Sequence, residues 1–134
     1  MKVGDKSSLT KVFNKEDVLI FSKISMDTNP IHFDSDYAAN TRFKSCIVQG
    51  PMVASLIGGV LGSHLPGNGT IYISQTTRFI KPVYIGDKVT ANVEVIKIRK
   101  EKPIVTLRTW VINQNDDIVL DGEAVILYLD FKSL

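Results

Sequence analysis

The first third of the chain places apolar residues at helical spacing. Val18, Phe21 and Ile24 recur every three residues, which is the period of one face of an α-helix. Asn14 stands before them, and asparagine is a favourable N-cap because its side chain accepts from the first free N–H groups. The pattern therefore predicts an amphipathic helix over residues 14–25, preceded by an extended segment.

A second predicted helix covers residues 51–65, where almost every position is apolar. Pro51 suits the first helical position, because the N–H that proline lacks has no partner there. Gly58, Gly59 and Gly62 each lower the helix propensity by about 0.8–1 kcal/mol relative to alanine, so a close neighbour is expected to compensate. A helix that is apolar on all sides must be enclosed by its own domain, and this one is shorter than the ~20 residues that a membrane span needs.

From Thr70 onward the apolar period changes from helical to alternating. Four β-rich runs are separated by turn-forming residues, at 71–79, 88–99, 103–113 and 118–130. In the second run the apolar phase slips from Val95 to Ile96, which predicts a β-bulge. Early helices and late antiparallel strands predict an α+β fold, in which one strongly curved antiparallel sheet wraps around the long apolar helix.

Composition narrows the class of protein. The 134 residues are 44% hydrophobic and 22% charged, with a net charge of +2, which is typical of a globular domain and too weakly basic to mark a nucleic-acid-binding face. One cysteine excludes an internal disulfide, and two histidines give no zinc ligand set. The first ten residues lack the apolar run of a signal peptide. We expect a soluble cytoplasmic protein, a single domain over residues 1–134, without a metal, nucleic acid or membrane partner.

One run of residues carries candidate chemistry. Asp27-Thr-Asn-Pro-Ile-His32 places a carboxylate and an imidazole five positions apart in a loop that Pro30 restricts, and two such groups aimed at one water define an acid–base site. The residues alone leave another interpretation open: Asp27 only ends a helix, Asn29 and Pro30 only form a turn, and His32 is a core histidine.

The same run, followed by Asp34, resembles the hydratase motif of the MaoC-like (R)-specific enoyl-CoA hydratases, a family with the hot-dog fold. Further blocks resemble that family in order and spacing, so the similarity covers nearly the whole chain. They lie at 43–50, 52–61, 65–69, 79–83, 86–89 and 122–124.

The resemblance implies a role for each matching residue. Asp27 would be the general base that activates water for addition to the β-carbon of a trans-2-enoyl-CoA. His32 would hold the same water and deliver a proton to the α-carbon, and the N–H of Gly50 would bind the thioester oxygen. Asn29 would support the loop. The family implies no cofactor beyond the coenzyme A of its substrate.

The resemblance also implies an apolar slot for the acyl chain, lined partly by the central helix and a late strand. By alignment Gly58, Leu61 and Val125 are its candidate residues, and the missing side chain at Gly58 is expected to leave room beyond a four-carbon acyl group. One position departs from the family pattern: Gln49 stands before Gly50, where many relatives carry histidine.

Two other functions remain open from the sequence. A hot-dog acyl-CoA thioesterase would share the fold, since fold does not fix the reaction, but such enzymes usually lack the Asp-x-Asn-Pro-x-His run. A non-catalytic acyl-CoA-binding protein would have no use for both Asp27 and His32. Hot-dog relatives pair their sheets, so we expect a homodimer or a higher homo-oligomer.

Overall fold

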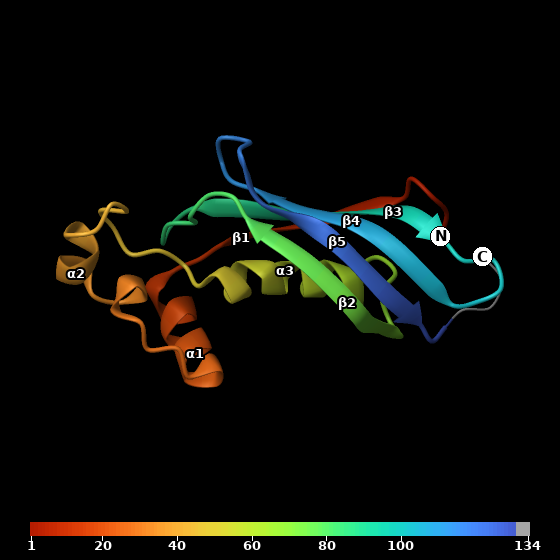
Figure 1. The fold of residues 1–134 in the computed structure, drawn as a ribbon, viewed down its shortest axis with the longest axis horizontal. Helices are drawn as coiled ribbons and strands as arrows, with labels where there is room; N and C mark the ends of the chain where they lie inside the picture. Colours follow the sequence, from red (N-terminus) through yellow and green to blue (C-terminus); the bar gives the residue numbers. More distant parts are fainter. Residues whose placement is uncertain (131–134) are drawn as a thin grey trace.

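A five-stranded antiparallel sheet curves over one long helix in the computed structural model, which describes residues 1–130 (Figure 1). The elements in chain order are β1 (Lys6–Val12), α1 (Lys15–Ser25), the 3₁₀ turn η1 (Pro30–His32), α2 (Ser35–Ala39), α3 (Gly50–Ser63), β2 (Thr70–Phe79), β3 (Lys88–Ile98), β4 (Ile104–Ile112) and β5 (Ile118–Tyr128). The strand order is β1-β3-β4-β5-β2, so β1 and β2 are the two edges of the sheet. The α+β architecture predicted from the sequence is confirmed.

The core lies between α3 and the concave face of the sheet. Ile57, Val60 and Leu61 of α3 are almost fully buried, and so are the residues of β3 and β4 that face them, such as Val93 and Leu107. Alternate residues of these strands are buried because successive side chains point to opposite faces. Burial from all sides explains why α3 tolerates an apolar composition throughout.

The predicted irregularity of β3 is also confirmed. The pairing of β3 with β4 shifts between Val95 and Lys97, which places the bulge at Ile96. A bulge adds one unpaired residue and bends its strand.

The segment between β1 and α3 extends past the end of the sheet, where α1, η1 and α2 lie at the N-terminal end of α3 (Figure 1). Its first helix begins as predicted at Asn14, whose side chain accepts from the N–H of Asp17 at 2.9 Å, while the Asp17 carboxylate accepts from the N–H of Asn14 at 3.0 Å. This reciprocal capping box satisfies two N–H groups at the helix start. The segment therefore holds its loops beside the start of α3.

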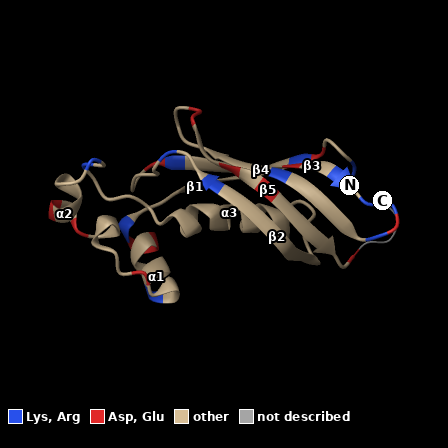
Figure 2. Ribbon diagram, viewed as in Figure 1, with Lys and Arg blue, Asp and Glu red and all other residues tan. Residues whose placement is uncertain are grey.

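Charged residues are interspersed over the strands, hairpins and helices, with no large face of one sign (Figure 2). No helix within residues 1–130 combines the length and the hydrophobicity that crossing a bilayer needs.

Candidate active site

The side chains of Asp27 and His32 face each other. Asp27 Oδ2 lies 3.5 Å from His32 Nε2. His32 is buried, with 7% of its surface exposed, whereas 41% of the Asp27 side chain is open to solvent. The pair is thus a buried imidazole with a carboxylate on its accessible side, which is the geometry that two groups acting on one water require.

The backbone fixes the tautomer of His32. Its Nδ1 lies 2.7 Å from the carbonyl oxygen of Ile47. A carbonyl only accepts hydrogen bonds, so Nδ1 carries a hydrogen. In the neutral ring Nε2 therefore has a free lone pair, and Nε2 carries a proton only when the ring is an imidazolium.

Three neighbouring residues orient Asp27. Helix α1 ends at Met26 in the left-handed conformation, and the next N–H, of Asp27, donates to Ser25 Oγ at 3.2 Å. The hydroxyl of Ser22 donates to the backbone carbonyl of Asp27. The N–H of Asn29 donates to Asp27 Oδ1 at 3.0 Å, which leaves Oδ2 free to face the imidazole.

The loop that carries His32 is tied to the segment before α3. Asn29 Oδ1 accepts from the N–H of Ile31 at 3.3 Å, a turn that asparagine side chains favour. The N–H of Ile47 donates to the carbonyl of Ile31 at 3.2 Å. Backbone and side chain of the motif are therefore both held against residues that lead directly to Gly50.

Within residues 1–130, helix α3 presents a single free N–H at its start. Pro51 has no N–H, and the N–H groups of Met52 and Val53 donate to the carbonyl of Gln49 at 3.0 and 3.2 Å. The N–H of Gly50 has no acceptor within residues 1–130. It lies at the positive end of the helix dipole, which suits an oxygen that gains negative charge.

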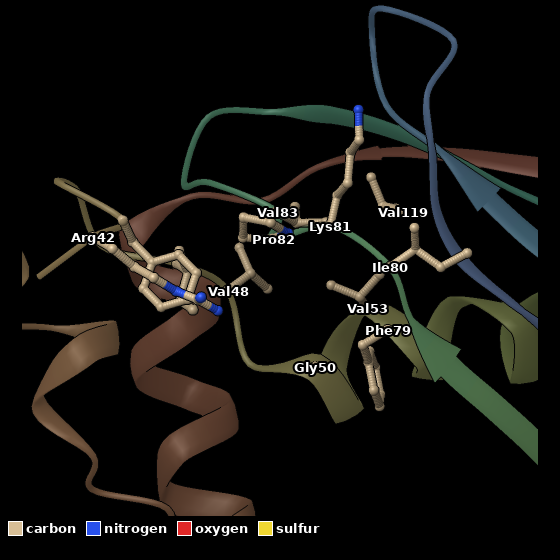
Figure 3. A pocket seen from close by; sticks show the side chains of 12 residues that line it. Arg42, Val48, Gly50, Val53, Phe79, Ile80, Lys81, Pro82, Val83 and Val119 are labelled. Carbon is tan, nitrogen blue, oxygen red and sulfur yellow. The ribbon is translucent and has the colours of Figure 1, made fainter.

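A cavity of about 250 Å³ adjoins Gly50 and is largely apolar. Figure 3 shows Arg42 directing its guanidinium toward this cavity, whereas the ammonium of Lys81 extends away from it. Phe79 packs closely at the glycine, since a Cβ added at position 50 would lie 2.9 Å from Phe79 Cε1. The absence of a side chain at position 50 therefore keeps the N–H accessible from the cavity.

His32 lines a separate cavity of about 340 Å³, together with Phe33, Cys46 and Ile85. The single chain thus does not place His32 and Gly50 in one cavity. The connection between them is Ile47, whose carbonyl holds His32 and whose side chain lines the Gly50 cavity.

The three residues expected to form an acyl slot have different surroundings. Gly58 borders an open groove of about 490 Å³ that also includes Tyr72. Leu61 is 1% exposed and belongs to the core. Val125 is on the opposite face of β5 from Ala124, which is buried on the α3 side, because neighbouring residues of a strand alternate between faces.

The expectation of one acyl slot lined by Gly58, Leu61 and Val125 stays a prediction, of which the single chain shows only the groove at Gly58. Tyr72 borders the groove at Gly58, and a Cβ added at position 58 would lie 3.6 Å from Tyr72 Cε2.

Sequence reasoning missed Tyr72 and the contact made by Gln49. Tyr72 meets Gly58 only through the packing of β2 against α3, which no local pattern reveals. Although 46% of Tyr72 is exposed, partial burial raises the pKa of its hydroxyl above the ordinary value of 10.0. Gln49 is fully buried, and the only sequence signal was its departure from the histidine common at this position.

A curved sheet around a central helix defines a hot-dog protein, and this one carries a carboxylate–imidazole pair tied to the segment before that helix. Residues 3–115 match the family model described as MaoC like domain. The chain belongs to this MaoC-like family.

Named relatives agree with this assignment. The chain is 45% identical over 126 residues to the (R)-specific enoyl-CoA hydratase of Aeromonas caviae, covering 94% of each chain. It is 43% identical over 127 residues to the (R)-specific enoyl-CoA hydratase of Rhodospirillum rubrum, covering 95% of this chain and 88% of that one. A solved structure described as the (R)-hydratase from A. caviae involved in PHA biosynthesis matches with a TM-score of 0.92 at 45% identity, over 94% of this chain and 96% of that one.

Proposed function

We propose that the protein is an (R)-specific enoyl-CoA hydratase, which adds water reversibly to a trans-2-enoyl-CoA and forms an (R)-3-hydroxyacyl-CoA. The observation that carries the proposal is the 3.5 Å approach of Asp27 Oδ2 to His32 Nε2, beside a segment that leads to a free helix-start N–H. Relatives that share 45% and 43% of its residues bear this name.

Proton transfer follows from the tautomer of His32. A water that contacts both side chains from their open side donates one hydrogen to Asp27 Oδ2 as its oxygen bonds to the β-carbon. Because Nδ1–H is held by Ile47, the proton for the α-carbon must come from Nε2 of the imidazolium. Transfer of a proton from Asp27 back to His32 then restores the starting pair, and atoms and charges balance.

The N–H of Gly50 stabilises the charge that develops between these two transfers. Addition to the β-carbon makes the thioester an enolate, whose oxygen needs a fixed hydrogen-bond donor. An amide at a helix start supplies that donor without a side chain. The reaction consists of C–O bond formation and proton transfers, so it calls for no cofactor beyond the coenzyme A of the substrate.

We also propose a homodimer formed through β2. This strand is an edge of the sheet, and Ile71, Tyr72 and Ile73 on it are large exposed residues. An exposed apolar edge is a template for pairing with another chain. Analytical ultracentrifugation that finds only a monomer at micromolar concentration would contradict this assembly.

The setting we propose is the cytoplasm, within fatty acid metabolism. A chain with one cysteine, Cys46, which has no partner for an internal disulfide, suits a reducing compartment.

The decisive assay is hydration of crotonyl-CoA with chiral analysis of the product. Hydration removes the absorbance of the conjugated enoyl thioester and releases no thiol, whereas a thioesterase releases coenzyme A. A non-catalytic binding protein changes neither signal. We expect loss of conjugation, an (R)-3-hydroxy product and a kcat about 10²- to 10⁴-fold lower in His32→Ala.

A further inference from the structure

Gln49 makes a long-range contact at the junction of the two halves of the site. Its side chain is 0% exposed, and Nε2 donates to the carbonyl oxygen of Val18 at 3.0 Å, across 31 positions of sequence. Its Oε1 has no hydrogen-bond partner within residues 1–130. The amide is therefore held through its N–H group alone.

This contact joins the element that holds the base to the element that holds the oxyanion donor. Val18 lies within α1, whose last turns fix Asp27 through Ser22 and Ser25. At the other end, the N–H of Gly50 belongs to the peptide group that follows Gln49. The side chain of Gln49 thus links the orientation of that peptide group to the position of α1.

The main chain and the side chain of Gln49 contact different helices. The carbonyl of Gln49 accepts from the N–H groups of Met52 and Val53, so the peptide group between residues 49 and 50 is fixed on its carbonyl side by the helix. The Gln49 side chain makes no capping bond to α3. It donates instead to Val18 of α1, so it affects the spacing between α1 and α3.

We propose that Gln49 is a positioning residue, which sets the distance from the N–H of Gly50 to the carboxylate of Asp27. The inference rests on the proposed hydratase function and adds a residue that touches neither the substrate nor the water. Misplacing reacting groups by about 1 Å can cost roughly 10²-fold in rate.

Stability and catalysis should respond differently to the loss of this contact. Val18 is in a helix interior, so its carbonyl keeps the hydrogen bond from the N–H four residues later. Replacing Gln49 by an apolar residue of similar shape also removes the unpartnered Oε1, whose burial is unfavourable. We therefore expect a small change in stability and a large change in kcat.

The test compares Gln49→Met with Gln49→His in the crotonyl-CoA assay. Methionine keeps the unbranched shape without a donor, and histidine keeps an N–H donor. We expect kcat to fall about 10- to 100-fold in Gln49→Met with KM within about threefold of wild type, and to recover to within about fivefold in Gln49→His. Thr109→Val is the matched control, because Thr109 is also 0% exposed but lies on β4; its kcat should not change.

Each outcome bears on the proposal. An unchanged kcat in Gln49→Met, or an equal loss in Gln49→His, overturns it. Gln49→Leu is the second apolar variant, and failure of both apolar variants to fold would assign the residue to stability and also overturn it. A wild type without hydratase activity refutes the proposed function; crystal structures of wild type and Gln49→Met then decide positioning, because an unchanged spacing between Gly50 and Asp27 would overturn it.

Discussion

Asp27→Asn tests the acid–base pair with little change in shape. Asp27 Oδ1 accepts from the N–H of Asn29, so the amide oxygen of the new side chain must take that place. The NH₂ group then takes the place of Oδ2, which in the wild type lies 3.5 Å from His32 Nε2. An amide group cannot accept the proton of a water, so the variant loses its base.

The expected loss of kcat follows from removal of the general base. A general acid or base contributes about 10²- to 10⁴-fold, which corresponds to about 3–5 kcal/mol in the activation barrier. The free energy of unfolding should change by less than about 1 kcal/mol, because the carboxylate is 41% exposed and exposed ion pairs contribute little.

The assay follows the absorbance of crotonyl-CoA at saturating substrate, with thermal unfolding measured in parallel. Asp121→Asn is the matched control, because Asp121 is 40% exposed and pairs with Arg108 at 3.9 Å. It lies on β5, next to the buried Leu120 and therefore on the other face of the strand. We expect a large loss of kcat in Asp27→Asn alone. A folded Asp27→Asn protein with kcat within threefold of wild type would refute the acid–base assignment.

Three further outcomes are expected. Gly50→Ala places a methyl group 2.9 Å from the Phe79 ring and should lower kcat/KM for crotonyl-CoA about tenfold or more, with partial recovery in Gly50→Ala/Phe79→Ala; equal rates in both variants would argue against this packing. Gly58→Ala fits beside Tyr72 at ordinary contact distance and should raise the free energy of unfolding in urea by up to about 1 kcal/mol, whereas Gly58→Leu must displace the ring and change the acyl-length profile. The raised pKa of Tyr72 favours its neutral form in the folded state, so its contribution is complete below pH 10 and is lost as pH rises through the raised pKa; Tyr72→Phe should lose less stability than wild type between pH 9 and 11, and identical slopes would contradict this.

Much of the fold could be read from local pattern. The N-cap at Asn14 and the slip of apolar phase at Ile96 each depend on residues within one turn or a few strand positions, and both are confirmed. The predicted helix at Pro51 is also present, but it begins one residue earlier, at Gly50. The curved sheet followed from one requirement, since a helix apolar on every side has to be enclosed.

The rest depended on contacts between distant segments. The facing of Val125, on the side of β5 opposite to the buried Ala124, depends on the register of the sheet, which alignment alone does not state. The contact of Gln49 with Val18 joins two helices, and the one between Gly58 and Tyr72 joins a helix to an edge strand. Neither pair has a spacing that a sequence pattern could reveal.

The hydrogen bond from His32 to the carbonyl of Ile47 has a consequence for how this chemistry can be inherited or redesigned. The acceptor is main chain, so no substitution at position 47 deletes it, and every amino acid there offers the same oxygen. The tautomer of the His32 imidazole is therefore determined by the path of the main chain at residue 47 and not by the side chain at that position. If only an aspartate and a histidine were transplanted onto another scaffold, nothing would determine which ring nitrogen of the histidine carries the hydrogen.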